Sequence, residues 1–597
     1  MTYPTEQYQP TRWSLDSILA APTGSPVDET LASLEVAVTE IENLRPLLSS
    51  DIDEAVFSKT ISTIETITVL GNRLGSYGPL WFSEDTQNQE ALVFMGRMEQ
   101  ILAEAQNRIL FFSLWWKALE DEAADRLMNA VDEDLRYHLY QERLFKDHAL
   151  SEPEEQIINL KDINGISAIV TLYDMITNKF TFELEVEGEV QQLTRDQLMT
   201  HVRSPEAEHR AAAYQKLYQV YEKEDNVLAQ IYTHRVRDWA TENMKLRHFP
   251  SPISVRNKMN DIPDEVTNTL LDVCAEQATV FHRYFKLKAG WLGLPAGDLR
   301  RYDLYAPISS ESDKKIDYTD AIDIVLTSLG EFSPMVADHA YKVFKDGHID
   351  AEIRPNKRGG AFCASILPGV TPWVLANYTG EPRQVATLAH ELGHAIHALL
   401  AADHSILTFH SALPMAETAS VFSEMLLMDR LLAEENSVSV RRNLLLEAVD
   451  DMYATVLRQA YFVLFEREAH QMIAQGATKE DLNKAYLANL AQQFGDSLKV
   501  SEDFQQEWIV IPHIYHTPFY CYAYSFGQLL VLALYRRYQE QGDAFKPGYL
   551  KLLAYGGSNR PEAILQEAGI DIADPVFWQG GFDVISDMID ELEAIEL

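Results

Sequence analysis

Residues His390 to His394 read His-Glu-Leu-Gly-His, which places two imidazoles four positions apart with a carboxylate beside the first. On a helix, side chains four positions apart lie on one face about one turn apart, so both imidazoles can bind a single zinc ion. Glu391 can then reach a water that the ion activates. The spacing therefore predicts metal-assisted hydrolysis.

The residues on both sides of this motif are apolar. They are Val385, Ala386, Leu388 and Ala389 before it and Ala395, Ile396, Ala398, Leu399 and Leu400 after it. A helix that is apolar on nearly all sides must be buried. Buried histidine and glutamate are costly unless they are hydrogen-bonded or bound to a metal. This context favours a functional site over a surface helix.

A hydrolytic zinc site needs a third protein ligand and an open fourth position. His397 is a poor candidate, because seven residues of helix separate it from His390 by about 10 Å; we expect it to pack or to support a ligand. The metzincin pattern fails, since it needs Gly and His where this chain has His397 and Leu400. The spacing of zinc aminopeptidases would use Leu413, which cannot bind a metal.

A glutamate on a following helix remains as the third ligand. The downstream candidates are Glu417, Glu424, Glu434, Glu435 and Glu447. Glu417 is the best of them, because the small residues Ala416, Thr418, Ala419 and Ser420 let a helix there approach the motif closely. Glu424 lies seven positions later, on the same helix face. It can hydrogen-bond a ligand imidazole or be an ordinary helix carboxylate.

Peptide hydrolysis also needs hydrogen-bond donors for the negative charge that develops on the attacked carbonyl. The segment 511–527 concentrates His513, Tyr515, His516, Tyr520, Tyr522 and Tyr524. Tyrosine and histidine can both donate near neutral pH. Because aromatic clusters also pack protein cores, their density alone does not select one donor.

The elements that carry these residues are mostly helical by their periodicity, with examples at Gln89 to Lys117 and Glu206 to Leu246. Alternating apolar residues around Gly188 predict a hairpin within 180–193. We take this hairpin as the boundary between an N-terminal helical region, 1–195, and a catalytic region, 196–597.

Strand character returns directly before the motif. Residues 361–378 contain two apolar segments joined by Pro368 and Gly369, as expected of two short strands. A small sheet therefore precedes the helix that carries the predicted metal ligands.

The composition of the chain argues against proteins that bind nucleic acid or span a membrane. The 597 residues include 90 Asp plus Glu and 50 Lys plus Arg, for a net charge of −40. Such an acidic chain is repelled by nucleic acid phosphate. The three widely spaced cysteines suit a reducing compartment, and the apolar runs are shorter than the roughly 20 residues of a membrane span. We expect a soluble cytoplasmic protein that binds neither nucleic acid nor membranes.

Taken together, the motifs resemble the oligoendopeptidase F branch of the thimet oligopeptidase-like zinc metallopeptidases. The resemblance rests, in chain order, on RWSLDSI at 12–18, DLYAP at 303–307, KRGGAFCAS at 357–365, TLAHELGHAIHALL at 387–400, MAETAS at 415–420 and HIYHTPFYCYAYSFG at 513–527. It implies a mainly α fold: a large multi-helical bowl or clam-shaped gluzincin with a small β-sheet near the active site and an enclosed substrate channel.

The resemblance also implies roles for single residues. His390, His394 and Glu417 match the ligands of one zinc ion per chain, and Glu391 matches the general base. The supporting roles of Glu424 and His397 rest on their spacing alone. Tyr522 and His513 match donors to the transition state, while Phe519 stands where some relatives have a further tyrosine. Gly360, Ala361 and Phe362 match an edge strand that pairs with the substrate. We add Tyr515, Tyr520 and Tyr524 as substrate-binding residues.

The function that we expect is that of a zinc-dependent oligoendopeptidase, which hydrolyses internal bonds of short peptides with a zinc-bound water activated by Glu391. A related helical zinc carboxypeptidase would share the metal site but act at the carboxyl end. A non-catalytic peptide-binding protein of the same fold is a further alternative, although it would not need Glu391. Subsite preferences and oligomeric state stay open.

Overall fold

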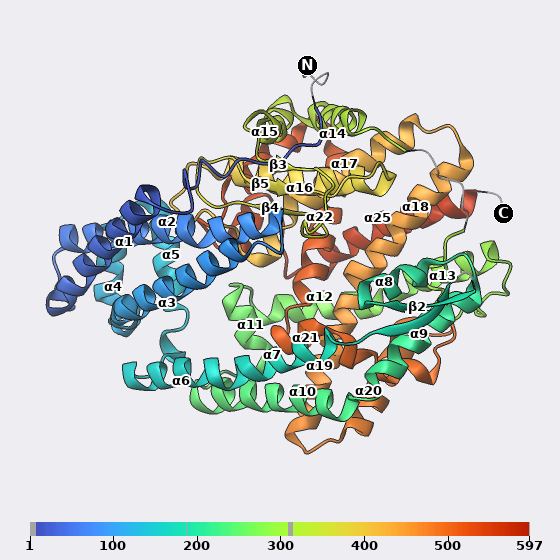
Figure 1. Cartoon of the computed structure of the whole chain (residues 1–597), viewed down its shortest axis with the longest axis horizontal. Helices are drawn as coiled ribbons and strands as arrows, with labels where there is room; N and C mark the ends of the chain where they lie inside the picture. The colour runs from blue at the N-terminus through green and yellow to red at the C-terminus, as the bar shows by residue number, and fades with distance from the viewer. Residues whose placement is uncertain (1–7, 187, 309–314, 596–597) are drawn as a thin grey trace. The chain divides into compact units, whose positions relative to one another are not determined.

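Helices make up most of the molecule (Figure 1), and the sheets are small. The computed structural model describes residues 8–186, 188–308 and 315–595. Its internal contacts define two compact units, each assembled from three separate stretches of chain. Unit 1 is Met1–Ala149, Lys314–Glu434 and Arg537–Ile570, and unit 2 is Leu150–Asp313, Glu435–Arg536 and Asp571–Leu597. The mainly α class is confirmed, whereas the contacts divide the chain differently from a boundary at residue 195.

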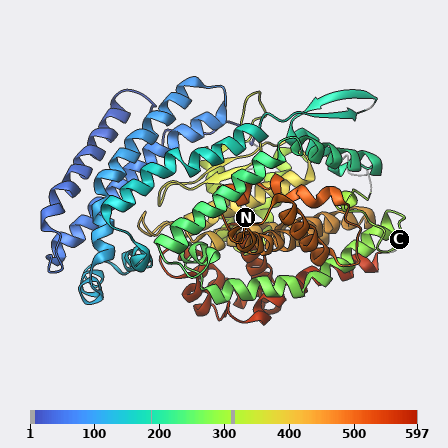
Figure 2. The ribbon, with the colours of Figure 1, turned by 90° about the horizontal axis from the view of Figure 1, so that it is seen from below.

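Unit 1 begins with a layer of long helices that lie side by side in Figure 2. Its helices are α1 (Ser25–Leu44), α2 (Glu54–Glu84), α3 (Gln89–Ala118), α4 (Asp121–Met128), α5 (Glu133–Arg143), α14 (Tyr318–Phe332), α15 (Pro334–Lys345), α16 (Pro382–Leu400), α17 (Thr418–Glu434), α23 (Lys546–Ala554) and α24 (Pro561–Glu567). The side chains of Asp53 and Asn88 cap the first turns of α2 and α3. The helix expected at Gln89 to Lys117 is thus confirmed as α3.

A three-stranded sheet of unit 1 lies beside the motif helix. Its order is β3 (Ile349–Asp350), β5 (Trp373–Leu375), β4 (Phe362–Ala364), with β4 antiparallel to β5 in a register that pairs Cys363 with Val374. The two strands expected within 361–378 are therefore confirmed, and β4 is an edge strand. The side-chain amide of Asn377 donates to the carbonyl of Gly360 at 2.7 Å, which fixes the chain entering β4.

Unit 2 contains the predicted hairpin and most of the remaining helices. Strands β1 (Phe182–Val186) and β2 (Glu189–Leu193) pair antiparallel. The helices are α6 (Glu152–Asn164), α7 (Ile166–Thr177), α8 (Arg195–Thr200), α9 (Ala207–Tyr221), α10 (Asp225–Trp239), α11 (Pro252–Met259), α12 (Asp264–Glu276), α13 (Ala278–Trp291), α18 (Val438–Met452), α19 (Arg458–Ala474), α20 (Lys479–Phe494), α21 (Pro512–His516), most of α22 (Tyr522–Gln541), and α25 (Pro575–Ala594).

The prediction of a single helix from Glu206 to Leu246 is wrong. The chain forms α9, turns at residues 222–224, forms α10 and then continues as a π-helix, Ala240–Leu246. The break falls at Glu222, Lys223 and Glu224, which are all exposed and offer no apolar side chain to the core. Because the apolar residues are periodic on both sides of these three residues, the sequence pattern predicts one continuous helix.

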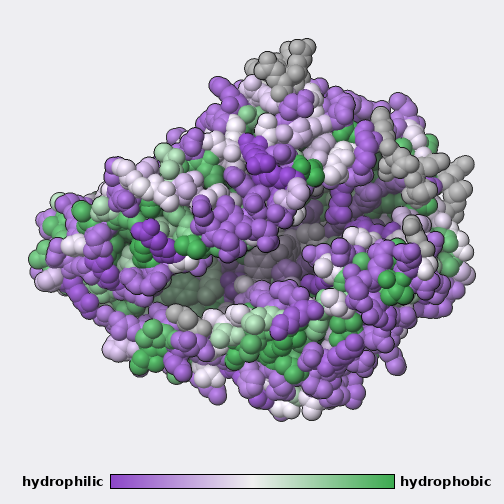
Figure 3. Space-filling view, in the orientation of Figure 1, coloured by the Kyte–Doolittle hydropathy of each residue, from purple (hydrophilic) through white to green (hydrophobic). Residues whose placement is uncertain are grey.

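The surface in Figure 3 is largely hydrophilic, in keeping with the high content of charged residues. Large apolar side chains are nevertheless exposed on α6 and α7: Ile157, Leu160, Leu172 and Met175. No helix among the described residues is both long and apolar enough to cross a bilayer.

Candidate metal centre and active site

Helix α16 carries both histidines of the motif and the glutamate between them. The helix begins with Pro382 at a first-turn position, where the missing N–H costs nothing, and the Glu381 amide donates to the side-chain oxygen of Gln384 at 3.1 Å. Most of its length is buried, as the flanking apolar residues predict. His390 and His394 are half-buried one turn apart, with their ring centroids 4.8 Å from each other.

A close approach between α16 and α17 brings the third donor to these histidines. A Cβ atom at Gly393 would lie 2.5 Å from Ser420 Cα and 2.6 Å from the Ala419 carbonyl oxygen, closer than real Cβ atoms come. Only glycine fits there. The small residues expected to allow close packing next to Glu417 therefore do so, against a glycine inside the motif.

Glu417 lies immediately before α17, which begins at Thr418, rather than within a helix as the sequence had suggested. Its carbonyl oxygen accepts the amide of Val421 at 3.2 Å, and its carboxylate accepts the hydroxyl of Ser420 at 2.7 Å. A carboxylate at the amino end of a helix is stabilised by the partial positive charge there. These contacts aim the carboxylate toward α16.

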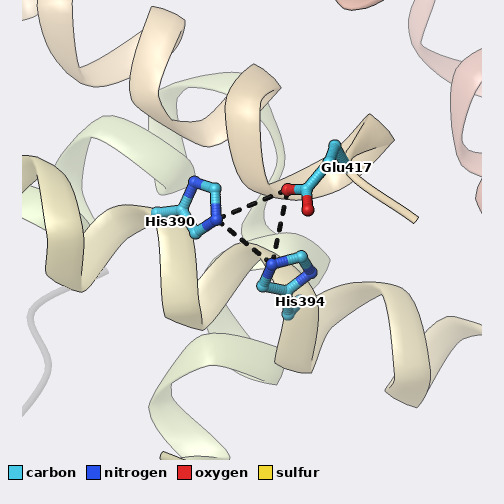
Figure 4. A group of neighbouring side chains, drawn as sticks. All are labelled: His390, His394 and Glu417. Atoms are coloured by element: carbon cyan, nitrogen blue, oxygen red, sulfur yellow. Dashed lines mark hydrogen bonds and ion pairs between the residues drawn. The ribbon is translucent and has the colours of Figure 1, made fainter. Parts of the chain in front are cut away.

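Three donor atoms converge in this region, as Figure 4 shows for His390, His394 and Glu417. The two Nε2 atoms are 3.2 Å apart, and Glu417 Oε2 is 3.4 Å from His390 Nε2 and 3.5 Å from His394 Nε2. Zinc bonds of about 2.0–2.1 Å in a tetrahedron require donors about 3.3 Å apart. The group of three has this spacing, so these residues fit one metal ion with the fourth position left open.

A further carboxylate fixes the orientation of the first imidazole. Glu424 contacts Nδ1 of His390, which leaves Nε2 of that ring directed at the group of three. Support of this kind is usual for metal-binding histidines. His397 is buried beside the site and is not one of the three donors.

The local electrostatics show an excess of negative charge around the donors. Burial alone would lower the pKa of His390, but Glu424, Glu417 and Glu391 together raise it to about 9. Burial, reinforced by the charges of Glu417 and Glu424, raises the pKa of Glu391 to about 7. A cation at the group of three would balance these carboxylates, and a carboxyl with a pKa near neutrality suits proton transfer.

One of the three donors, His394, lines a cavity of about 540 Å³ within unit 1, together with Glu391. Its lining joins β4 to the motif helix and includes Ala361, Phe362, Cys363, Glu391, His394, His397, Phe409 and His410. The predicted closeness of a small sheet to the site is thereby confirmed. Gly360 does not line the cavity, although Ala361 and Phe362 do.

The histidine- and tyrosine-rich segment belongs to unit 2, where it forms α21 and the start of α22. His513, Tyr520 and Tyr524 are half-buried and lie together: the His513 and Tyr520 rings are stacked 6.2 Å apart, and the Tyr520 and Tyr524 rings meet edge to face with centroids 5.2 Å apart. The Tyr524 hydroxyl is 3.5 Å from His513 Nε2. Burial lowers the pKa of His513, so its ring is neutral near pH 7.

The other two tyrosines of this segment point into the unit. The Tyr522 side chain is fully buried, and the side-chain amide of Asn260 donates to its hydroxyl at 2.7 Å. Tyr515 is also fully buried and stacks on Tyr173, with the ring centroids 3.9 Å apart. Exposure thus separates the five predicted residues into an accessible group, His513, Tyr520 and Tyr524, and a buried pair, Tyr515 and Tyr522.

Two residues that matter here escaped the sequence reasoning. Gly393 was read only as a variable position of the motif, although a glycine between two buried histidines is a signal for close helix packing. Asn260 lies 262 positions before its partner Tyr522, and nothing local indicates that contact.

Comparison with known proteins is consistent with this arrangement. Residues 200–583 match the sequence profile of peptidase family M3. The match covers more than half of the chain, including all the predicted metal ligands, so the chain belongs to peptidase family M3 and is a peptidase.

Its relatives match along nearly the whole chain. The oligoendopeptidase F homolog of Borreliella burgdorferi is 25% identical over 95% of both chains. The group B oligopeptidase PepB of Streptococcus agalactiae is 26% identical over 99% of this chain and 97% of its own. The similarity therefore places the chain in the oligoendopeptidase F branch.

Solved structures share the fold. A Chlamydophila abortus protein superposes with a TM-score of 0.86 at 23% identity and 100% coverage of both chains. Oligoendopeptidase F from Enterococcus faecium gives a TM-score of 0.73 at 23% identity over 95% of this chain and 98% of that one.

Proposed function

We propose that this chain is a zinc-dependent oligoendopeptidase, which hydrolyses internal bonds of short peptides. The observation that carries the proposal is the tetrahedral spacing of His390 Nε2, His394 Nε2 and Glu417 Oε2, with Glu391 on the same helix. A zinc ion held there would polarise the substrate carbonyl and lower the pKa of a water. We also infer a cytoplasmic location, because three widely spaced cysteines suit a reducing compartment.

Glu391 is the base and the acid of this reaction. Its carboxylate takes a proton from the attacking water and later gives that proton to the departing amine. Burial raises the pKa of Glu391 to about 7, close to the working range in which a carboxyl can both accept and return a proton.

Donors from the segment 513–524 stabilise the negative charge on the attacked carbonyl oxygen. His513, Tyr520 and Tyr524 are the accessible candidates, because their side chains are only partly buried and lie together. Tyr522 would first have to leave its hydrogen bond with Asn260. The substitutions Tyr520→Phe, Tyr522→Phe and Tyr524→Phe distinguish these donors, since loss of one such donor lowers kcat by about 10²–10³-fold.

The substrate backbone pairs with the free edge of β4. In the described sheet β5 occupies one side of β4, so the main-chain groups of the other side are available to an added strand. Ala361 and Phe362, which line the cavity together with Glu391, are the contact points. Pairing of this kind reads little of the substrate sequence, which suits an enzyme that acts on many short peptides.

The test of the mechanism is Glu391→Gln. This change keeps the size of the side chain and removes its basicity, so zinc content should stay at one ion per chain while kcat falls by roughly 10²–10⁴-fold. Asp403→Asn, which removes an exposed carboxylate beyond the end of α16, is the matched control and should leave both quantities unchanged. Near-normal turnover by the Gln variant would contradict the mechanism.

A further inference from the structure

Two arginines and a glutamate from three different helices hold a turn in unit 2 by hydrogen bonds to its backbone. We name residues 515–519, between α21 and α22, the 515–519 turn. Arg235 of α10 donates to the carbonyls of Tyr515 and His516 at 3.1 and 3.4 Å. Arg256 of α11 donates to the Pro518 carbonyl at 3.2 Å. On α19, a carboxyl oxygen of Glu466 accepts the Phe519 amide at 3.0 Å.

The last of these contacts holds a strained residue. Phe519 has φ +58°, a left-handed conformation that is unfavourable for a residue with a Cβ atom. Its ring is fully buried against His470, with the centroids 4.7 Å apart. A strained backbone persists only where its surroundings over-determine it, and such places are common in active sites. Here the surroundings are the Glu466 carboxyl and the two arginines.

The burial of Glu466 at this position costs free energy. The side chain has no solvent exposure, and its second carboxyl oxygen, Oε2, has no hydrogen-bond partner among the described residues. The groups that face it are Arg235 and Tyr232 of α10, Arg256 of α11 and Cys521 next to the turn, with His470 one turn along its own helix. A buried polar group that is only half satisfied needs an explanation. Packing does not supply one, because an apolar residue would fill the same space at lower cost.

The turn joins the accessible residues of the proposed oxyanion site. His513 precedes the turn, Tyr520 follows it directly, and Tyr524 lies further along the chain. The direction of the chain at Phe519 therefore sets how Tyr520 is presented relative to His513. On the other side, Tyr522 is anchored by Asn260. The hydroxyl and imidazole donors therefore depend on a backbone that Arg235, Arg256 and Glu466 hold.

We propose that Glu466, assisted by Arg235 and Arg256, is a positioning residue that holds the 515–519 turn so that His513, Tyr520 and Tyr524 are presented to the transition state. The inference rests on the proposed function. Glu466 itself touches neither substrate nor metal. It acts only through the Phe519 amide and the residues that follow.

The protonation of Glu466 agrees with this role. Burial raises its pKa to about 8, against the opposing influence of the Phe519 amide and of Arg256 and Arg235. The carboxyl is thus mostly neutral at pH 7, and its carbonyl oxygen accepts the Phe519 amide without a buried negative charge. Glutamine can reproduce that acceptor, whereas leucine cannot.

The experiment compares Glu466→Leu and Glu466→Gln in the zinc-loaded full-length chain, with Glu468→Gln as the matched control, because Glu468 is exposed on the same helix. Removal of the acceptor should lower kcat for a fluorogenic peptide by on the order of tenfold to a hundredfold with KM nearly unchanged. The Gln variant should keep kcat within about threefold, since it keeps the acceptor. Zinc content should not change in any variant.

Three further measurements keep the inference falsifiable. Arg256→Gln weakens the grip on Pro518 without touching the buried carboxyl and should lower kcat in the same way, even where Glu466→Leu fails to fold. The Gln variant should also lose any alkaline change of kcat near pH 8, because its side chain does not ionise. Hydrogen exchange at the Phe519 amide should be fast in Glu466→Leu and slow in Glu466→Gln.

The outcomes separate this inference from the proposed function. An active wild type with unchanged kcat in Glu466→Leu and Arg256→Gln overturns the inference alone. The inference alone is also overturned if kcat and KM change together in Glu466→Leu and the Gln variant does not restore kcat. That pattern is the one expected of a purely structural residue. A zinc-loaded wild type that cleaves no peptide overturns the proposed function, and the inference falls with it.

Discussion

At the scale of single residues, the centre of the molecule is a set of carboxylates arranged around two imidazoles. Glu417 completes the group of three donors, and Glu424 orients His390 from outside that group. These two glutamates lie seven positions apart, yet they do different things, because one faces the common point of the donors and the other faces the far side of a ring.

This difference gives a graded prediction for metal binding. Glu417→Ala removes a donor and should abolish stoichiometric zinc binding, whereas Glu424→Gln removes only support and should weaken it by about 10–100-fold. Dialysis against buffered zinc, followed by metal analysis, measures both. Glu434→Gln, at the exposed end of α17, is the control. A Glu417→Ala protein that still holds one zinc ion per chain would show that the third ligand is elsewhere.

The metal donors could be predicted from sequence because their geometry is local. The pairing of His390 with His394 can be predicted because they are one helical turn apart. Glu417 can be predicted because the small residues around it indicate close packing. The tyrosines could not be sorted in this way. Whether Tyr522 or Tyr524 is accessible depends on which side of α22 packs against Asn260, and that contact spans 262 positions of sequence.

At the scale of elements, the site depends on how closely α17 approaches α16. The contact at Gly393 permits that approach, since a Cβ there would collide with the backbone of Ser420 and Ala419. The apolar pattern identified α16 correctly, and strand patterning identified β4 and β5. The break between α9 and α10 was missed because the apolar periodicity resumes in the next helix.

Gly393→Ala should therefore damage the metal site without altering any donor. Overpacking of this kind costs about 1–3 kcal/mol, and relief of the collision would move Glu417 away from the histidines. We expect a lower melting temperature and weaker zinc binding. Gly359→Ala is the matched control, because a Cβ there would meet no atom within 4 Å. Unchanged zinc affinity in Gly393→Ala would contradict the packing argument.

A second link between elements gives unit 1 a pH-dependent stability. His404 pairs with Asp134 of α5 at 2.7 Å and contacts the Ala554 carbonyl of α23 at 2.7 Å. The hydrogen bond with Asp134 is the largest cause that raises the pKa of His404. A raised folded pKa contributes stability that is complete below the unfolded pKa of about 6.5 and is lost as pH rises through the folded value.

The melting temperature of His404→Gln should accordingly fall furthest below that of the wild type near pH 6. The difference should shrink as pH rises through the raised pKa of His404, because the wild-type imidazole is neutral above it as well. Differential scanning calorimetry across that range measures it. His234→Gln is the control, because His234 is an exposed histidine of α10 that is far in sequence from His404 and its partners. A difference that grows with pH would contradict the assignment of a charged His404 to the folded state.

At the scale of the whole molecule, one chain carries the group of three that could hold a metal in unit 1 and the proposed histidine and tyrosine donors in unit 2. The chain belongs to peptidase family M3, and it is similar to oligoendopeptidase F relatives along nearly its whole length. The support for a peptidase is therefore not limited to the residues of the metal site. The net charge of −40 adds an expectation about substrates: positively charged peptides should associate faster at low ionic strength.

The most direct test of the account is mass spectrometry of a mixed peptide library that has been incubated with the zinc-loaded protein. The library should include peptides blocked at both ends and a folded protein, and the Glu391→Gln variant should be run in parallel. We predict cleavage at internal bonds of the short peptides, blocked ones included, with no cleavage of the folded protein and almost none by the variant. Removal of residues only from free carboxyl ends, or equal cleavage by the Glu391→Gln variant, would contradict the account.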